Sequence, residues 1–225
     1  LGSLLDTFAH AKTFGSLIQI PKVTEDGLAS LEGGMSKAIE SGDVFSKAAA
    51  QDLVPLVQQA KTLAMKFDAV VANPPYMGGL FGSLKEFALQ QYPNSKTDLY
   101  SMFIERGLIF VRNVGYLSFV TMQSWMFLSS YEDLRRKLLR NNTLLALAHL
   151  GPHAFEEIQG ERVQVCCFAV AAKKIAGFLG TVHRLISGSA TEKREGLLKR
   201  NNEYSRVDQD VFLKLSDAAI AYKIS

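Results

Sequence analysis

The sequence is poor in cysteine, histidine and long apolar runs. Its only two cysteines, Cys166 and Cys167, are neighbours, and successive strand residues point to opposite faces, so we expect neither a disulfide framework nor a zinc site. The four histidines show no metal-ligand spacing, so no metal is expected. No apolar run reaches the roughly 20 residues that span a bilayer, and no secretory signal opens the chain. A cytoplasmic protein that does not contact membranes is therefore expected.

The chain also has little excess of one charge over the other. Lysine and arginine together number 25 against 22 acidic residues, which gives a formal net charge of +3. This balance is compatible with a polyanionic partner but does not require one. With 48% hydrophobic and 21% charged residues among 225, the composition is that of a globular chain with a substantial core, not of a disordered or coiled-coil protein.

Hydrophobic periodicity divides the chain into three parts. Residues 1–65 show helical spacing and form a helical lead-in segment, to which we assign no chemistry. Residues 66–175 alternate short apolar strands with amphipathic helices, as in a layered α/β sheet. Residues 176–225 are punctuated by glycines, include a charged segment at 192–206 that is expected to be solvated, and form an extension. Within the middle part, strands are expected at 67–72, 115–121, 144–150 and 163–171, and helices at 98–111 and 129–139.

The tetrapeptide Asn73-Pro74-Pro75-Tyr76 is the most informative motif. It follows the apolar run 67–72, which reads as a buried parallel strand, and ligands gather at the carboxyl ends of such strands. Prolines lack an amide hydrogen, so the strand must stop and the Pro74 carbonyl can face a ligand. That carbonyl and the Asn73 side-chain oxygen can accept both hydrogens of an exocyclic amino group, while the Tyr76 ring stacks on the base. A simple strand-ending turn is the competing interpretation.

This arrangement suits methyl transfer to an exocyclic amino group such as that of adenine, and does not itself exclude cytosine. The lone pair of the adenine amino nitrogen is delocalised into the ring, and two aligned acceptors favour a tetrahedral, more nucleophilic nitrogen. A sulfonium methyl donor can then be attacked in line, with orientation supplying most of the catalysis. Reaching that atom in duplex DNA requires extruding the nucleotide at a cost of a few kcal/mol, which stacking on aromatic rings offsets by roughly 1–3 kcal/mol per base.

Residues 66–174 resemble the adenine-specific amino-group DNA methyltransferases. Beyond the tetrapeptide, Thr97–Leu108 is similar to the helix that follows the catalytic strand in that family, and 115–121 to the next core strand. Residues 150–155, followed by 163–165, are similar to the segment whose aromatic residue lies on the far side of the extruded base. The pattern most resembles the catalytic regions of large restriction and phage-defence methyltransferases, including the BREX type.

The resemblance implies a Rossmann-like methyltransferase sheet with helices on both faces, S-adenosylmethionine as methyl donor, and double-stranded DNA as partner, with other subunits of a restriction or phage-defence complex as further candidates. Asn73, Pro74 and Tyr76 take the catalytic positions. Phe155 is the second base-stacking residue, and Phe103 lies against the adenine of the cofactor. Asp98 either contacts the cofactor or caps its helix, because aspartate is favoured at that position.

One feature of that family is missing. Its cofactor half opens with a strand and a glycine-rich turn, and nothing upstream of Asn73 matches either. The resemblance therefore implies an incomplete catalytic half of a longer enzyme that alone binds S-adenosylmethionine weakly or not at all. Two other functions stay open: methylation of a glutamine side chain in a protein, because enzymes of that type carry a similar tetrapeptide, and a non-catalytic DNA-binding module.

Basic side chains supply weaker candidates for DNA contact. Arg135 and Arg136 lie on the expected helix 129–139, where a solvated helical face is the competing interpretation. The resemblance implies that 176–225 is an extension toward a DNA-recognition region, because recognition segments attach beyond the core strands in the family. Lys199 and Arg200 lie in the charged segment of this extension. Contact with phosphate groups is the expected role of all four.

Overall fold

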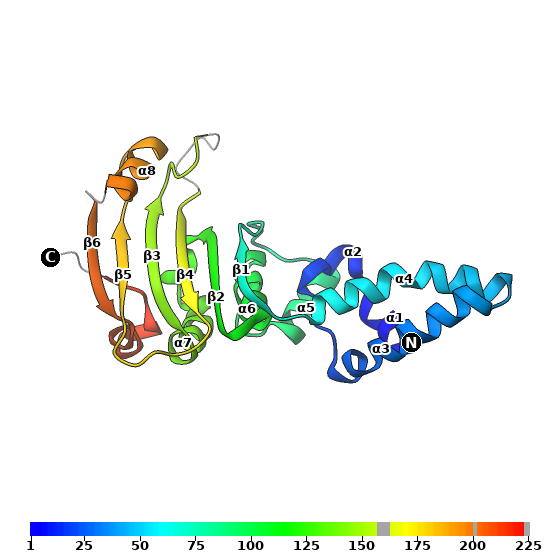
Figure 1. Cartoon of the computed structure of the whole chain (residues 1–225). Helices are drawn as coiled ribbons and strands as arrows, with labels where there is room; N and C mark the ends of the chain where they lie inside the picture. Colours follow the sequence, from blue (N-terminus) through cyan, green and yellow to red (C-terminus); the bar gives the residue numbers. More distant parts are fainter. Residues whose placement is uncertain (157–162, 200–201, 223–225) are drawn as a thin grey trace. The chain divides into compact units, whose positions relative to one another are not determined.

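The computed structural model describes residues 1–156, 163–199 and 202–222 (Figure 1). The chain divides into two compact units, Leu1–Lys66 and Phe67–Ser225, which are described separately. In the described part of the chain, no helix combines the length and apolarity needed to cross a membrane.

The first unit is helical, as expected. Leu4, Ile18, Leu28 and Val57 form its core with Phe8 and Ala60. Asp43 begins the last helix by accepting a hydrogen bond from the Ser46 amide at 2.8 Å. The elements are α1 (Gly2–Phe8), α2 (Ala11–Phe14), the 3-10 helix η1 (Gly15–Leu17), α3 (Lys22–Ser41) and α4 (Val44–Ala64).

The second unit is built on a six-stranded mixed sheet with the order β1-β2-β4-β3-β5-β6. Strand β1 pairs with β2 in parallel, β4 is antiparallel to both β2 and β3, β5 is parallel to β3, and β6 is antiparallel to β5. The carboxyl ends of β1, β2, β3 and β5 therefore lie at the same edge of the sheet (Figure 1). The strands are β1 (Phe67–Ala72), β2 (Val111–Met122), β3 (Thr143–Gly151), β4 (Val165–Ala171), β5 (Leu179–Arg184) and β6 (Glu203–Asp208).

Helices cover one face of this sheet. Ile104 of α6 and Leu134 and Leu138 of α7 pack with Phe119 and Phe168 of the sheet into one core. The helical elements of this unit are α5 (Gly82–Gln91), α6 (Leu99–Phe110), η2 (Gln123–Met126), η3 (Ser129–Tyr131), α7 (Glu132–Asn141), α8 (Ala190–Lys199), η4 (Gln209–Lys214) and η5 (Ser216–Ala218). The expected α/β class with a Rossmann-like sheet is confirmed.

Among the described residues, the opposite face of the sheet carries exposed side chains. Val71 is 77% exposed and Tyr116 is 56% exposed, and both lie on the face that also carries Ala146, Cys167 and Ala169. The expectation of a strand buried on both faces at 67–72 is therefore wrong for the described residues, because β1 lies at the edge of the sheet with one face uncovered. Helices are expected on both faces of the sheet. The described residues contain one such layer, on the face that packs against α6 and α7.

The four expected strands are confirmed, but the sequence analysis missed two more. The segment 192–206, expected to be solvated, contains most of α8 and the first four of the six residues of β6. Residues 176–222 add β5 and β6 to the same sheet. The role of 176–225 as an extension toward a DNA-recognition region stays a prediction. In the sequence Gly180 indicates a loop, but in the structure it lies in β5. A Cβ at this position would lie 2.4 Å from the Leu144 carbonyl oxygen, so glycine permits the close pairing of β5 with β3.

Candidate active site at the carboxyl edge of the sheet

Chain segments that leave four parallel strands form the candidate site. Asn73–Tyr76 follows β1, Gln123 follows β2 and residues 152–155 follow β3. The turn that leads into α8 follows β5. Ligands bind at this edge in open α/β sheets, so the fold brings the predicted tetrapeptide and Phe155 to the same edge.

The tetrapeptide is accessible. Asn73 and Pro75 are exposed, Tyr76 is half-buried and Pro74 is buried. The Tyr76 hydroxyl donates a hydrogen bond to Asn73 Oδ1 at 2.9 Å. Within the described residues the Pro74 carbonyl oxygen has no hydrogen-bond donor. The exposed Asn73 side chain and the Pro74 carbonyl, the two proposed acceptors, thus lie on the turn that directly follows β1.

Aromatic packing fixes the Tyr76 ring. It meets the Tyr100 ring edge to face, with centroids 6.2 Å apart and an interplanar angle of 88°. The Tyr100 hydroxyl in turn shares a 2.8 Å hydrogen bond with Ser124 Oγ, and its ring lies 6.0 Å from that of Tyr131. Burial raises the pKa of Tyr76 to about 12, so its hydroxyl is protonated at neutral pH and serves as the donor to Asn73.

Asp98 caps helix α6. Its Oδ1 accepts hydrogen bonds from the Tyr100 amide at 3.2 Å and from the Met77 amide at 3.1 Å. The second bond ties down the residue that directly follows Tyr76. Of the two roles that the sequence left open, capping is the one observed, and contact with the cofactor stays a prediction. Burial raises the pKa of the Asp98 carboxyl, against the opposing effect of these backbone donors.

Phe103 projects from α6 and is partly buried against the main core. Its expected contact with the adenine of the cofactor is not tested by the structure and stays a prediction.

The sequence analysis missed a polar network at this edge. His149, near the end of β3, bonds Tyr222 through Nδ1 and Gln123 through Nε2, and the Gln123 amide nitrogen donates to Gln164. Because Gln123 Oε1 is an acceptor, His149 Nε2 carries the proton and Nδ1 accepts from the Tyr222 hydroxyl. Burial, together with the nearby cations of Arg184 and Lys193, lowers the pKa of His149. In the sequence, the position of Gln123 directly after a core strand is the signal from which this network could have been predicted.

Phe155 lies beside a cavity of about 460 Å³. Thr191 and Arg194 of α8 line the same cavity, together with Glu156, whose carboxylate accepts a 3.1 Å hydrogen bond from the Thr191 hydroxyl. The stacking role of Phe155 stays a prediction. Lys193 belongs to the charged segment that is expected from the sequence to be solvated. It is instead buried and reaches the turn before Phe155, so that expectation is wrong at this residue.

The expected DNA contact of Arg135 is wrong. This residue is 0% exposed, and its guanidinium donates hydrogen bonds to the carbonyls of Trp125, Leu128 and Asp217 at 2.6–3.1 Å. The planar group with five donors joins segments that lie far apart in the sequence. Arg135 is therefore a structural residue of the core.

The other basic candidates lie at or near the surface. Arg136 pairs with Glu132 at 2.6 Å and donates to the Leu213 carbonyl. Lys199 is exposed and pairs with Glu195 at 2.6 Å, whereas Arg200 lies outside the described residues. DNA contact by these three residues stays a prediction.

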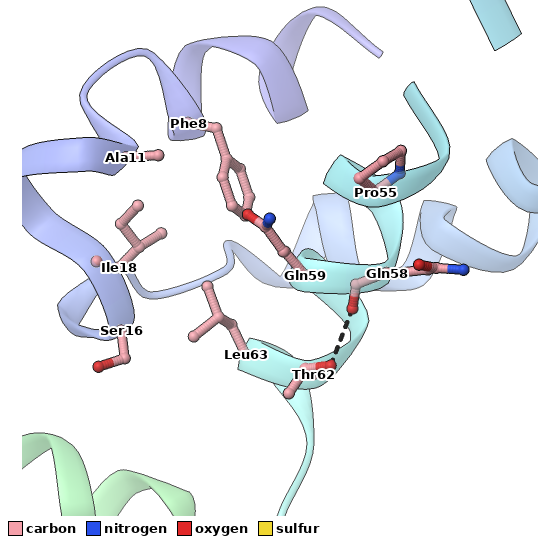
Figure 2. Close-up of a pocket in the computed structure, with 10 residues that line it drawn as sticks. Phe8, Ala11, Ser16, Ile18, Pro55, Gln58, Gln59, Thr62 and Leu63 are labelled. Atoms are coloured by element: carbon pink, nitrogen blue, oxygen red, sulfur yellow. Dashed lines mark hydrogen bonds between the residues drawn. The ribbon is translucent and has the colours of Figure 1, made fainter. Parts of the chain in front are cut away.

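The helical unit carries a separate cavity of about 420 Å³, shown in Figure 2. Its lining is mostly apolar and includes Phe8, Ile18 and Leu63, with Gln59 and Pro55 from α4. The described lining holds no ionisable side chain. That this segment supplies packing and not chemistry stays a prediction.

Comparison with known proteins gives consistent similarities. A family model described as Eco57I restriction-modification methylase matches residues 9–155. The chain is 43% identical over 220 residues to adenine-specific methyltransferase BrxX from Escherichia coli O9:H4 (strain HS), a match that covers 97% of this chain and 18% of that protein. It is 33% identical over 235 residues to adenine-specific methyltransferase PglX from Lacticaseibacillus casei (strain Zhang), covering 99% of this chain and 19% of that protein.

A solved structure shares the fold. It is a nuclease-deletion mutant of the type ISP restriction-modification enzyme LlaGI in complex with a DNA substrate mimic. The match has a TM-score of 0.52 at 17% identity and covers 76% of this chain and 19% of that one. The chain thus spans about a fifth of the length of these relatives.

Proposed function

Because the chain belongs to the family of Eco57I restriction-modification methylases, we propose that it supplies the catalytic part of an adenine-specific DNA methyltransferase. The enzyme transfers a methyl group from S-adenosylmethionine to N6 of an extruded adenine, in a restriction-modification or phage-defence system of the BREX type. The two curated relatives over 30% identical are both described as adenine-specific methyltransferases.

The acceptor pair of the tetrapeptide is the observation that carries the proposal. Asn73 Oδ1 has two lone pairs, and the Tyr76 hydroxyl occupies one of them at 2.9 Å. The second lone pair and the free Pro74 carbonyl remain for the two hydrogens of the target amino group. Because the hydroxyl fixes the rotation of the amide, the acceptors are oriented before the base arrives, which reduces reorganisation during the reaction.

These residues act by orientation. The two acceptors hold the amino group so that its nitrogen lone pair points at the methyl donor, and the amino proton is released after or during transfer. The Tyr76 ring, held by Tyr100, supports one face of the base. Phe155 supports the other face in this proposal. Strands β1 and β3 are three strand spacings apart, about 14 Å, which leaves space for the base between the side chains of Tyr76 and Phe155.

The residues present fit one part of a cofactor site. Phe103 is half-buried on α6, which contacts β1, the strand that ends directly before Asn73, and it can hold the adenine of S-adenosylmethionine. The described residues before β1 are helices α1 to α4 and their turns, without a strand and a glycine-rich turn of the family type. When bound, S-adenosylmethionine supplies the methyl group. We expect calorimetric titration of this chain alone to show weak binding or none, and micromolar affinity would contradict this expectation.

DNA is the expected substrate, because the LlaGI structure contains a DNA substrate mimic. The candidate edge of the sheet faces solvent at Asn73 and Pro75, as access for an extruded nucleotide requires. Association with other subunits of a restriction or phage-defence complex belongs to the same proposal.

The test uses the full-length enzyme with labelled methyl donor and duplex DNA. Asn73→Ala is expected to abolish incorporation of label into DNA while leaving folding intact, since Asn73 is exposed. Asn113→Ala, which changes an exposed asparagine on β2, is the matched control and should retain activity. Retained methylation by Asn73→Ala would refute the catalytic role. Label found in protein glutamine instead of DNA would favour a protein methyltransferase, and label in neither a non-catalytic module.

A further inference from the structure

Lys193 is a buried cation at the candidate active edge. The residue is 3% exposed, and its ammonium donates hydrogen bonds to the Leu150 carbonyl at 2.7 Å and to the Pro152 carbonyl. No acidic side chain in the described part of the chain lies within ion-pairing distance of it. Two backbone carbonyls on either side of Gly151 thus hold this ammonium.

Burial of such a charge without a carboxylate is unfavourable. An ammonium loses its hydration on burial, and partial charges on carbonyl oxygens compensate less well than a counter-ion. Burial accordingly lowers the pKa of Lys193. An apolar side chain of similar length would fill the space without this cost. The charge therefore serves the carbonyls that it binds, not merely the packing of α8.

The backbone that it binds is unusual. Gly151 has φ +62° and His153 has φ +56°, a region that non-glycine residues rarely adopt and that tertiary contacts must stabilise. This turn leads from β3 directly to Phe155. Strained backbone of this kind gathers at ligand sites, where the surrounding structure holds it in place.

Lys193 is itself firmly placed. Helix α8 begins with a reciprocal cap, in which the Ser189 amide donates to Glu192 Oε2 at 2.7 Å and the Glu192 amide donates to Ser189 Oγ at 3.3 Å. The Lys193 amide also donates to the Ser189 carbonyl at 3.0 Å. The Lys193 ammonium therefore extends from a capped helix, α8, to the turn that follows β3.

We propose that Lys193 is a positioning residue that holds the turn 151–154, so that Phe155 is presented to the extruded base. This rests on the proposed function and assigns Lys193 a role in receiving the base, without contact with the base itself. Loss of the ammonium leaves the two carbonyls without their donor and releases the turn, so Phe155 no longer occupies one defined position.

The test compares variants of the full-length enzyme on duplex DNA with 2-aminopurine at the target adenine, whose fluorescence rises on extrusion. Lys193→Met is expected to reduce the fluorescence rise severalfold and kcat/KM for unmodified target DNA at least tenfold, with unchanged affinity for S-adenosylmethionine. Lys193→Arg should restore part of both signals, because it keeps a cation. Lys214→Met, which changes an exposed lysine of η4 that has no proposed role in DNA contact, is the matched control and should behave as wild type.

A double-mutant comparison separates positioning from general stability. If Lys193 acts through Phe155, adding Lys193→Met to Phe155→Ala should cost little beyond Phe155→Ala alone. Additive losses, wild-type behaviour of Lys193→Met, or an equal loss of S-adenosylmethionine binding would each overturn the proposal. If Lys193→Met does not fold, Lys193→Gln, which retains donors on a shorter side chain, is measured by the same signals and judged by the same outcomes. A wild-type enzyme that neither extrudes nor methylates adenine would overturn the proposed function itself, and this inference with it.

Discussion

The hydroxyl of Tyr76 donates a hydrogen bond to Oδ1 of Asn73, three residues earlier in the same turn, at 2.9 Å. The two side chains that the sequence assigns to the amino group and to the base are therefore coupled to each other. Since the prolines between them restrict the backbone, this bond leaves the Asn73 amide little freedom to rotate. The orientation of the Asn73 acceptor thus depends on the Tyr76 hydroxyl, while the ring of the same tyrosine is proposed to stack on the base.

Tyr76→Phe separates these two contributions. The ring that stacks on the base remains, while the hydroxyl that orients Asn73 is lost. A hydrogen bond of this kind contributes about 0.5–1.5 kcal/mol, so we expect kcat of the full-length enzyme to fall about twofold to thirteenfold, with little change in KM for DNA. Tyr204→Phe, which removes the hydroxyl of an exposed tyrosine on β6, is the control. Equal kcat values for Tyr76→Phe and wild type would contradict a role for this bond.

Arg135→Met tests the assignment of a buried structural arginine. Removing the guanidinium leaves the carbonyls of Trp125, Leu128 and Asp217 without these donors. Each buried acceptor left unpaired costs about 1–3 kcal/mol, so the free energy of unfolding should fall by at least that amount. Trp125 is the only tryptophan and is fully buried, so its fluorescence reports urea unfolding of the sheet unit.

Arg140→Met is the matched control for that measurement. Arg140 lies exposed near the end of the same helix, so the change should stay within about 0.5 kcal/mol of wild type. If the two variants had equal stability, the structural role of Arg135 would be refuted.

The predictable part of the fold rests on local signals. The run 67–72 is apolar and β-branched and ends abruptly at Asn73-Pro74, so both the strand and its end follow from neighbouring residues. Asp98 is likewise a favoured cap before an apolar helix. The position of the tetrapeptide at a sheet edge could therefore be predicted from sequence alone.

The unpredicted part depends on distant partners. Arg135 sits in a basic run typical of a solvated face, and its burial is decided by the Asp217 carbonyl, 82 residues away. The same holds for Lys193, whose partners Leu150 and Pro152 are more than 40 residues distant. Strand β5 could not be predicted because Gly180 is typical of a loop in the local sequence. The need for glycine there comes from the close approach of the β3 backbone, which lies far away in the sequence.

Gly107→Ala and Gly34→Ala should have opposite effects, although both glycines lie inside helices. At position 107 a new Cβ would lie 2.5 Å from Leu117 Cδ1 and 2.8 Å from Phe119 Cζ, so overpacking should lower the free energy of unfolding by about 1–3 kcal/mol. At position 34 nothing lies within 4 Å, and alanine should stabilise α3 by about 0.4–1 kcal/mol. Trp125 fluorescence follows the first variant and helical circular dichroism the second. Stabilisation by Gly107→Ala would show that α6 does not approach β2 as described.

His149 should make the stability of the sheet unit depend on pH. Burial lowers the pKa of His149 in the folded state below its usual value of 6.5. The unfolded chain therefore binds this proton more readily than the folded chain. Its contribution to stability is fully present above pH 6.5 and is lost as the pH falls from there towards the lower pKa of the folded state.

His149→Gln removes this titration while keeping a side chain that can hydrogen-bond to Gln123 and Tyr222. We expect the variant to be less stable than wild type at pH 7.5, because the imidazole bridges both partners, but to lose less unfolding free energy between pH 7.5 and 5.5. Urea titrations followed by Trp125 fluorescence at several pH values measure both slopes. His10→Gln removes an exposed histidine from the helical unit and should keep the wild-type slope. If His149→Gln also kept the wild-type dependence of unfolding free energy on pH, another group would account for the acid sensitivity. The fold would then not require the neutral form of the imidazole that links Gln123 to Tyr222.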